Sequence, residues 1–389
     1  MARKRRADND IVHTNISFSQ VDFWMLLSVI LLVGIGTMMI FSASTPSSYA
    51  KSSSSTAYDV LKTQIIYTAL GIGVLILASM VDYKLLGRFS IALFAVSTLL
   101  MAAVIPFGTT RNNARRWLKL GILFQPSEIL KIAVVFFIAY VLSQKNIREK
   151  ARGLWGILIF VLPVAVNIGL LVLQPHISCV LIIVAIVALM MFAGKVKART
   201  FIVTILIAVA AIAAILLFVK SNEKLSLDYI INRIAAHGGE AESEADTYQA
   251  TQSLYAIGSG GLFGRGFGKS IQKYLYLPEP YNDFIFSILA EEMGLVGVLL
   301  VISLFIILIM RGYKISSNAP DLFGALTAFG IISNVAIQVV LNLAVVSKLM
   351  PVTGISLPFF SYGGTSLIIM MASMGVVLNI SKQSRYSKF

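Results

Sequence analysis

Apolar stretches long enough to cross a bilayer recur along this 389-residue chain. A membrane-spanning helix needs about 17–25 mostly apolar residues. Ten such stretches occur, at about 23–43, 61–80, 86–106, 127–143, 154–173, 177–193, 200–219, 284–310, 322–345 and 364–380. Because lipid offers no partner to backbone N–H and C=O groups, a spanning stretch of this kind must be helical. The sequence therefore predicts an all-α polytopic membrane protein with ten transmembrane helices, forming one integral membrane domain over residues 1–389.

Composition excludes several other classes of protein. The chain is 57% hydrophobic and only 13% charged, whereas a soluble domain carries about 25% charged residues. Its net charge of +14 does not indicate nucleic-acid binding, because the basic residues gather in short loops between apolar stretches. The one cysteine, Cys179, permits no intramolecular disulfide. The three histidines, His13, His176 and His237, are too far apart in sequence to suggest a zinc site.

The loop charges predict the orientation of the chain. Cytoplasmic loops of membrane proteins carry an excess of Lys and Arg. If the N-terminus is cytoplasmic, every segment on that side is basic, at 3–6, 84–88, 145–152, 195–199, 311–314 and 382–388. The first apolar stretch is too long for a signal peptide and is interpreted as an uncleaved span. We therefore predict cytoplasmic N- and C-termini, with residues 1–22 as a cytoplasmic tail.

Three outer segments then stand out. Residues 106–126 carry basic side chains against the topological bias, which indicates an anionic partner or, alternatively, lipid headgroups. Residues 220–282 form a large extracytoplasmic loop before the eighth helix, acidic at first and then rich in glycine turns at 258–268. Phe263 occupies a position where a phosphate-binding Walker loop needs glycine. Residues 346–364 are rich in proline and glycine, which predicts a re-entrant segment at the outer face.

Glu128 and Lys131 open the fourth apolar stretch. Pro126 suits the first turn of a helix, and Glu128 lies near the positive end of the helix dipole. A helix-start carboxylate is the structural alternative for Glu128. Lys131 lies three residues later on the same helix face. An ion pair inside a membrane usually faces a polar cavity.

Asp283 lies where the eighth apolar stretch begins. A carboxylate at the membrane edge needs a structural or a chemical role. The structural alternative is an N-cap, which aspartate favours. Glu291 lies eight residues later and shares about the same helix face, next to Glu292. A polar face of this extent is more than a cap requires.

These residues occur in motifs that resemble the SEDS family, the shape, elongation, division and sporulation proteins. The matching motifs are Arg116-Trp117, Phe124-Gln125-Pro126-Ser127-Glu128 with Lys131, Tyr248-Gln249, Leu277-Pro278-Glu279 with Asp283, and Pro358-Phe359 with Ser361-Tyr362-Gly363-Gly364. The Gly268-Lys269-Ser270 run with Lys273 resembles the division and sporulation branch more than the elongation branch. His176 stands where the family usually has aspartate, and the acidic 237–246 segment has no counterpart.

The resemblance implies a peptidoglycan glycosyltransferase that polymerises lipid II at the outer face of the bacterial cytoplasmic membrane. It implies Asp283 as the catalytic base and a class B penicillin-binding protein, a transpeptidase, as partner, among other division or sporulation membrane proteins. Candidate substrate-binding residues are Arg116, Lys131, Glu128, Arg115, Arg111, Gln125, Ser361 and Lys273. A divalent cation, Mg²⁺ or Mn²⁺, could assist the diphosphate, although no dedicated cage is evident. The alternatives are a transporter of the lipid-linked precursor and a passive scaffold for the transpeptidase.

Overall fold

The computed structural model describes residues 21–50, 57–111, 114–120, 122–145, 162–174, 176–197, 199, 201–203, 206 and 244–384. Most of these residues are helical. The helices are α1 (Phe23–Ala50), α2 (Ala57–Met80), α3 (Tyr83–Phe107), α4 (Pro126–Ser143), α6 (Leu162–Leu173), α7 (Ile177–Ala193), α10 (Glu244–Ser259), α11 (Ile285–Ser317), α12 (Leu322–Val346) and α13 (Gly364–Gln383). Helix α10 lies within the predicted large loop, so the described part of that loop is not purely turns.

Among the residues that the structure describes, seven helices are long and apolar enough to cross a membrane: α1, α2, α3, α4, α11, α12 and α13. Helices α6 and α7 are apolar but shorter. These nine helices overlap nine of the ten predicted spans. The predicted span at 200–219 lies almost wholly outside the described residues, as do most of the N-terminal tail and the 237–246 segment. The count of ten, the membrane orientation and the cytoplasmic termini therefore stay predictions.

The expectation of an all-α chain is wrong between α3 and α4. Strands β1 (Thr109–Arg111), β2 (Ala114–Leu120) and β3 (Ile122–Phe124) form an antiparallel sheet in the order β1-β2-β3. Leu118 is buried and its neighbour Lys119 is exposed, which is the alternation expected of a half-buried strand. This run is too short to produce a periodic signal beside the long apolar stretches.

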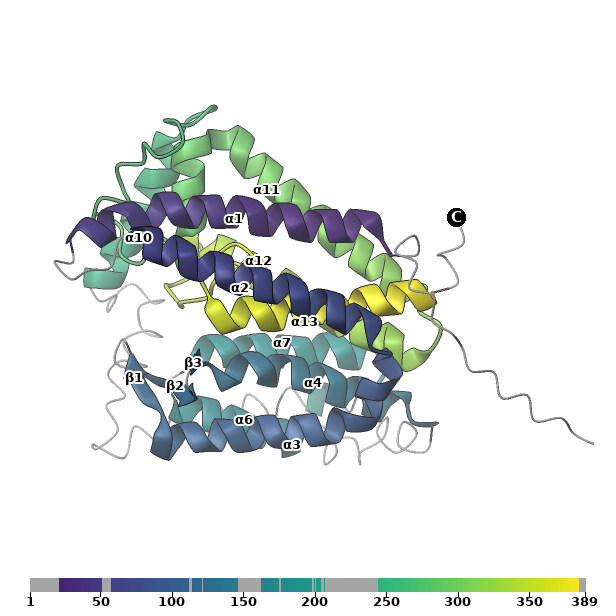
Figure 1. Ribbon diagram of the computed structural model, residues 1–389. Coiled ribbons are helices and arrows are strands. Elements are labelled where there is room, and N and C mark those ends of the chain that lie inside the picture. Colours follow the sequence, from purple (N-terminus) through teal and green to yellow (C-terminus); the bar gives the residue numbers. More distant parts are fainter. Residues whose placement is uncertain are drawn as a thin grey trace, which may run out of the picture.

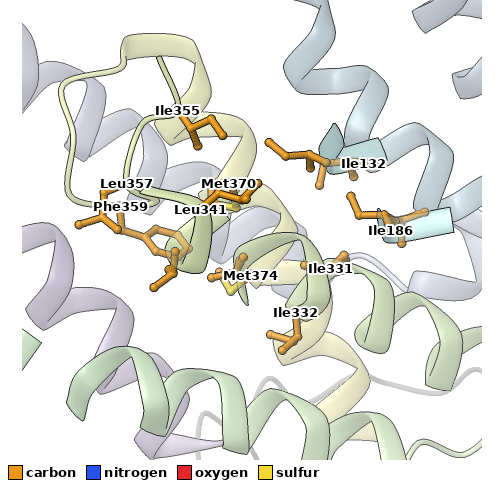
Figure 2. Close-up of a cluster of buried hydrophobic side chains, with 14 of the residues drawn as sticks. Ile132, Ile186, Ile331, Ile332, Leu341, Ile355, Leu357, Phe359, Met370 and Met374 are labelled. Carbon is orange, nitrogen blue, oxygen red and sulfur yellow. The ribbon is translucent and has the colours of Figure 1, made fainter. Parts of the chain in front are cut away.

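Helix α12 lies at the centre of the bundle and contacts α3, α4, α7, α11 and α13 (Figure 1). Figure 2 shows part of the resulting core. Its labelled residues come from α4, α7, α12, α13 and the segment between α12 and α13: Ile132, Ile186, Ile331, Ile332, Leu341, Ile355, Leu357, Phe359, Met370 and Met374. The irregular segment 347–363 is thus packed into the bundle by its own apolar side chains.

The bundle has two ends, which we name by a residue at each. At the Arg311 end, the Arg311 guanidinium pairs with the Asp22 carboxylate across 2.5 Å, and the Tyr83 hydroxyl donates to Asp321 across 2.6 Å. These contacts join α1 to α11 and α3 to the α11–α12 turn. At the Asp283 end lie the sheet, α10, the loop 260–283 and segment 347–363 (Figure 1).

Candidate active site

Asp283 lies immediately before the start of α11. The helix begins at Ile285, and its N-cap is Phe284, which makes no side-chain capping hydrogen bond. The interpretation of Asp283 as the N-cap is therefore wrong, because the carboxylate lies one residue too early. Asp283 is partly buried at the end of the turn 281–284.

Asn342 of α12 holds the backbone at Asp283. Its side-chain amide donates to the carbonyl oxygen of Asp283 across 2.8 Å and to that of Ile355 across 2.7 Å. Asn342 is completely buried. One side chain therefore ties the Asp283 turn to segment 347–363. The sequence analysis missed this residue, although a polar Asn inside an apolar span is a signal that could have found it.

Segment 347–363 also contacts the Asp283 turn directly. The Tyr362 N–H donates to the Tyr281 carbonyl across 3.0 Å, and the two rings meet edge-on at 5.8 Å between centroids. Gly354 has φ +68°, and a Cβ built on it would lie 3.5 Å from Oδ2 of Asp283. The carboxylate therefore faces the backbone of this segment.

Three non-glycine residues near Asp283 in the chain or in segment 347–363 have a strained backbone. Leu275, Glu279 and Phe359 have positive φ angles of 67°, 49° and 64°. For a residue other than glycine this conformation is unfavourable because the Cβ crowds the backbone, and such strain clusters at functional sites. Two of the three residues lie just before Asp283, and the third lies in segment 347–363.

The α6–α7 turn connects this corner to Arg116. On one side, Arg116 Nε donates to the Gln174 carbonyl across 3.3 Å. On the other, the Ser178 hydroxyl donates to the carbonyl of Thr353, which lies one residue before Gly354. His176, where the family pattern differs, is the buried N-cap of α7 within this turn. Arg116 and Asp283 therefore lie at one end of the bundle, linked through a short turn.

The predicted ion pair between Glu128 and Lys131 is confirmed. Lys131 Nζ lies 2.9 Å from Glu128 Oε1, and their side chains are 5% and 13% exposed respectively. Helix α4, which carries this pair, contacts both α7 and β2. Gln125, the N-cap of α4, makes no side-chain capping bond there. The ion pair and the strand that carries Arg116 therefore lie on neighbouring elements.

Glu128 and Ser361 line one narrow cavity of about 10 Å³, room for about one water molecule. The remaining wall residues are Gln338, Ser356, Leu357, Pro358, Phe359, Ser366, Leu367 and Met370. The Ser361 hydroxyl accepts from the Leu357 N–H across 2.8 Å. The cavity therefore joins two predicted substrate-binding residues from α4 and segment 347–363.

Three other candidates are placed differently. Lys273 is 3% exposed, and its ammonium donates to Ser42 Oγ, the Gly268 carbonyl and Glu292. All three donors are used, so this geometry does not support the expectation that Lys273 binds substrate. Arg115 is exposed and donates to the Ile105 carbonyl across 3.0 Å. Arg111 lies in β1, with its side chain outside the described part.

The fold and this site define a multi-pass helical membrane protein. Asp283, Arg116 of β2 and the ion pair of Glu128 with Lys131 lie toward one end of its bundle. The chain belongs to the FtsW/RodA/SpoVE family, described as cell cycle proteins, whose profile matches residues 23–386. It is 38% identical over 372 residues to stage V sporulation protein E of Bacillus subtilis, covering 94% of this chain and 98% of that protein.

Three further matches agree with this family. The chain is 32% identical to a Bacillus subtilis protein named "Probable peptidoglycan glycosyltransferase FtsW", covering 94% of this chain and 92% of that one. Among solved structures, it matches a chain from a study of a peptidoglycan synthase complex that coordinates polymerization and crosslinking, with TM-score 0.72, 25% identity and coverage of 94% and 99%. RodA of Thermus thermophilus matches with TM-score 0.67, 27% identity and coverage of 94% and 98%.

Proposed function

We propose that this protein is a peptidoglycan glycosyltransferase that polymerises lipid II into β-1,4-linked glycan at the outer face of the bacterial cytoplasmic membrane. The proposal rests on family membership, which extends over nearly the whole chain. Asp283, which the SEDS resemblance implies as the base, lies in a turn that Asn342 ties to segment 347–363. Relatives that match most of the chain are named as peptidoglycan glycosyltransferases.

The reaction assigns a role to each group. Asp283 accepts the proton of the 4-hydroxyl of the N-acetylglucosamine on the incoming lipid II. The oxygen then bonds to the anomeric carbon of the growing chain, the bond from that carbon to the diphosphate breaks, and the configuration inverts. Polyprenyl diphosphate leaves with the electron pair. Arg116 stabilises the negative charge that develops on this leaving group, and the ion pair of Glu128 and Lys131 shapes the neighbouring cavity.

We assign no step to a metal ion. Within the residues that the structure describes, no three His, Cys, Asp or Glu side chains lie close enough together to hold one. The substrate diphosphate would itself supply oxygen ligands to a bound divalent cation. Loss of activity in EDTA and its recovery with Mg²⁺ or Mn²⁺ would establish that requirement.

The peptidoglycan synthase complex among the structural matches, which coordinates polymerization and crosslinking, supports a crosslinking partner, and we propose a class B penicillin-binding protein, a transpeptidase, in that role. The transporter alternative is not favoured, since relatives are named as glycosyltransferases and the polar residues above gather toward one end of the bundle.

Lipid II polymerisation by the purified protein, with and without the transpeptidase, tests the proposal. Asp283→Asn should abolish glycan synthesis and leave the thermal midpoint unchanged, because the amide keeps the shape but cannot take the proton. Asp59→Asn is the matched control, because Asp59 is an exposed carboxylate in the first turn of α2, and it should be fully active. Glycan synthesis by Asp283→Asn at the wild-type rate would remove the base assignment and leave the transporter and scaffold alternatives.

A further inference from the structure

The loop after α10 exposes several large apolar side chains. Phe263 is 82% exposed and Leu262 is 63% exposed. The other exposed members are Phe267, Ile271, Tyr274, Leu275 and Tyr276. We call these seven residues the glycine-loop surface. An exposed apolar patch of this kind marks contact with a protein or a membrane.

The backbone of this loop is fixed to α11 where that helix breaks. Gly294 has φ +64° and ψ −163°, so the backbone departs from helical geometry at this residue. Two loop N–H groups, of Arg265 and Gly266, donate to the carbonyls of Glu291 and Glu292 across 2.9 and 3.0 Å. In return, the N–H groups of Leu295 and Val296 donate to the carbonyls of Gly261 and Leu262 across 3.0 and 3.2 Å. The loop thereby replaces the hydrogen bonds that the helix loses at the break.

Two buried carboxylates hold the rest of the loop. Glu291 accepts from the Ser270 hydroxyl across 2.5 Å and from the Ile271 N–H across 2.9 Å. Glu292 accepts from the Gly268 N–H across 3.0 Å and from the Lys273 ammonium across 2.9 Å. The apolar side chains are therefore presented from a rigid platform.

The loop is bonded to α11 at Gly294, and this level corresponds to a boundary of the membrane. From Gly294 to Arg311 the helix rises by about 26 Å at about 1.5 Å per residue, and a bilayer has a hydrocarbon core about 30 Å thick. Arg311, paired with Asp22, marks the opposite boundary. The first turns of α11 after the break expose Leu295, Val296 and Leu299, a surface typical of contact with lipid. Leu262 is hydrogen-bonded beside Val296, at that same level.

We propose that the glycine-loop surface is immersed in the membrane leaflet at the Asp283 end. Leu262, Phe263 and Phe267 extend the lipid-contacting face of α11 sideways, and Figure 1 shows the loop next to the N-terminal part of α11, at the edge of the bundle. The exposed Lys269 and Arg265 supply positive charge beside the apolar residues. This arrangement suits an interface with anionic lipid headgroups. The loop thus docks on lipid, independently of the catalytic assignment.

Spin labels measure this depth directly. The 389-residue chain has one cysteine, Cys179, which is buried, so a Cys179→Ser background allows single labels. Variants Phe263→Cys and Phe267→Cys are compared with Leu299→Cys on the lipid face of α11 and with Lys119→Cys, exposed on β2. Each is placed in nanodiscs of phosphatidylethanolamine and phosphatidylglycerol without any partner protein. Collision rates with oxygen and with a water-soluble nickel chelate are then measured.

The proposal expects the labels at 263 and 267 to collide more with oxygen than with nickel, as at 299, and expects the reverse ratio at 119. A label from Lys269→Cys should give an intermediate ratio, near the headgroups. Nickel accessibility at 263 equal to that at 119 would overturn the proposal and show a water-exposed surface available to a protein partner. Protection of 263 from both reagents would also overturn it, since another protein surface would then cover the loop.

Discussion

Asn342 and Asp283 are 59 residues apart in the chain, and a hydrogen bond of 2.8 Å from the Asn342 amide to the Asp283 carbonyl joins them. The same amide reaches Ile355, so one buried side chain sets the position of the turn that carries the carboxylate. Its own oxygen has no hydrogen-bond partner among the residues that the structure describes.

Asn342→Ala should therefore slow lipid II polymerisation. Two backbone carbonyls would lose their donor, and leaving a buried polar group unpaired costs about 1–3 kcal/mol, which shifts the turn that presents Asp283. We expect kcat to fall by about tenfold, since about 1.4 kcal/mol on the barrier is tenfold in rate, with little change in KM. Ser347→Ala is the control, because that hydroxyl donates to the carbonyls of Leu343 and Ala344 in its own helix. A change in KM alone would contradict the positioning role.

Arg116→Ala should weaken the response to lipid II. The guanidinium at this position is proposed to bind the diphosphate, so its loss should raise the lipid II concentration that gives half-maximal rate by tenfold or more, since a charge-assisted contact contributes about 1.5–3 kcal/mol. Arg115→Ala is the matched control, because Arg115 is exposed and bonded to Ile105 instead. Equal curves for the two variants would place Arg116 outside the site.

Lys273→Met should destabilise the protein strongly. Glu292 is 0% exposed and would lose its cation at 2.9 Å, and breaking a buried pair in this way costs about 3–5 kcal/mol. The thermal midpoint of the detergent-solubilised protein measures the effect. Arg265→Ala should change it little, because Arg265 is 39% exposed and lies 3.6 Å from Glu291, and exposed pairs contribute about 0–1 kcal/mol. Equal midpoints for Lys273→Met and wild type would show that the pair does not hold the loop.

Gly294→Ala should prevent the loop from docking on α11. Its φ of +64° disfavours any other residue, and a Cβ there would lie 2.3 Å from the Gly264 nitrogen. Gly73→Ala is the control within α2, where nothing lies within 4 Å of the added Cβ, and it should be neutral or slightly stabilising. Limited proteolysis of the 261–276 loop compares the two. Equal cleavage rates would contradict a requirement for glycine at the break.

The sequence alone predicted most of the helices and one functional contact. Long apolar stretches determine spanning helices because lipid leaves the backbone no alternative. Glu128 and Lys131 were paired correctly because three residues along a helix place two side chains on one face. The SEDS motifs singled out Asp283, and the structure then showed that it precedes the helix cap.

Only the tertiary structure decided which polar groups share a site. Lys273 looked like a substrate ligand in sequence, yet Ser42, 231 residues away, and Glu292 use its donors. Glu291 and Glu292 seemed to continue a polar face from Asp283, yet they hold the glycine loop. Asn342 reaches Asp283 from another helix. Local spacing along the chain determines a helix and its faces, whereas the partner of a buried charge depends on which distant segments pack beside it.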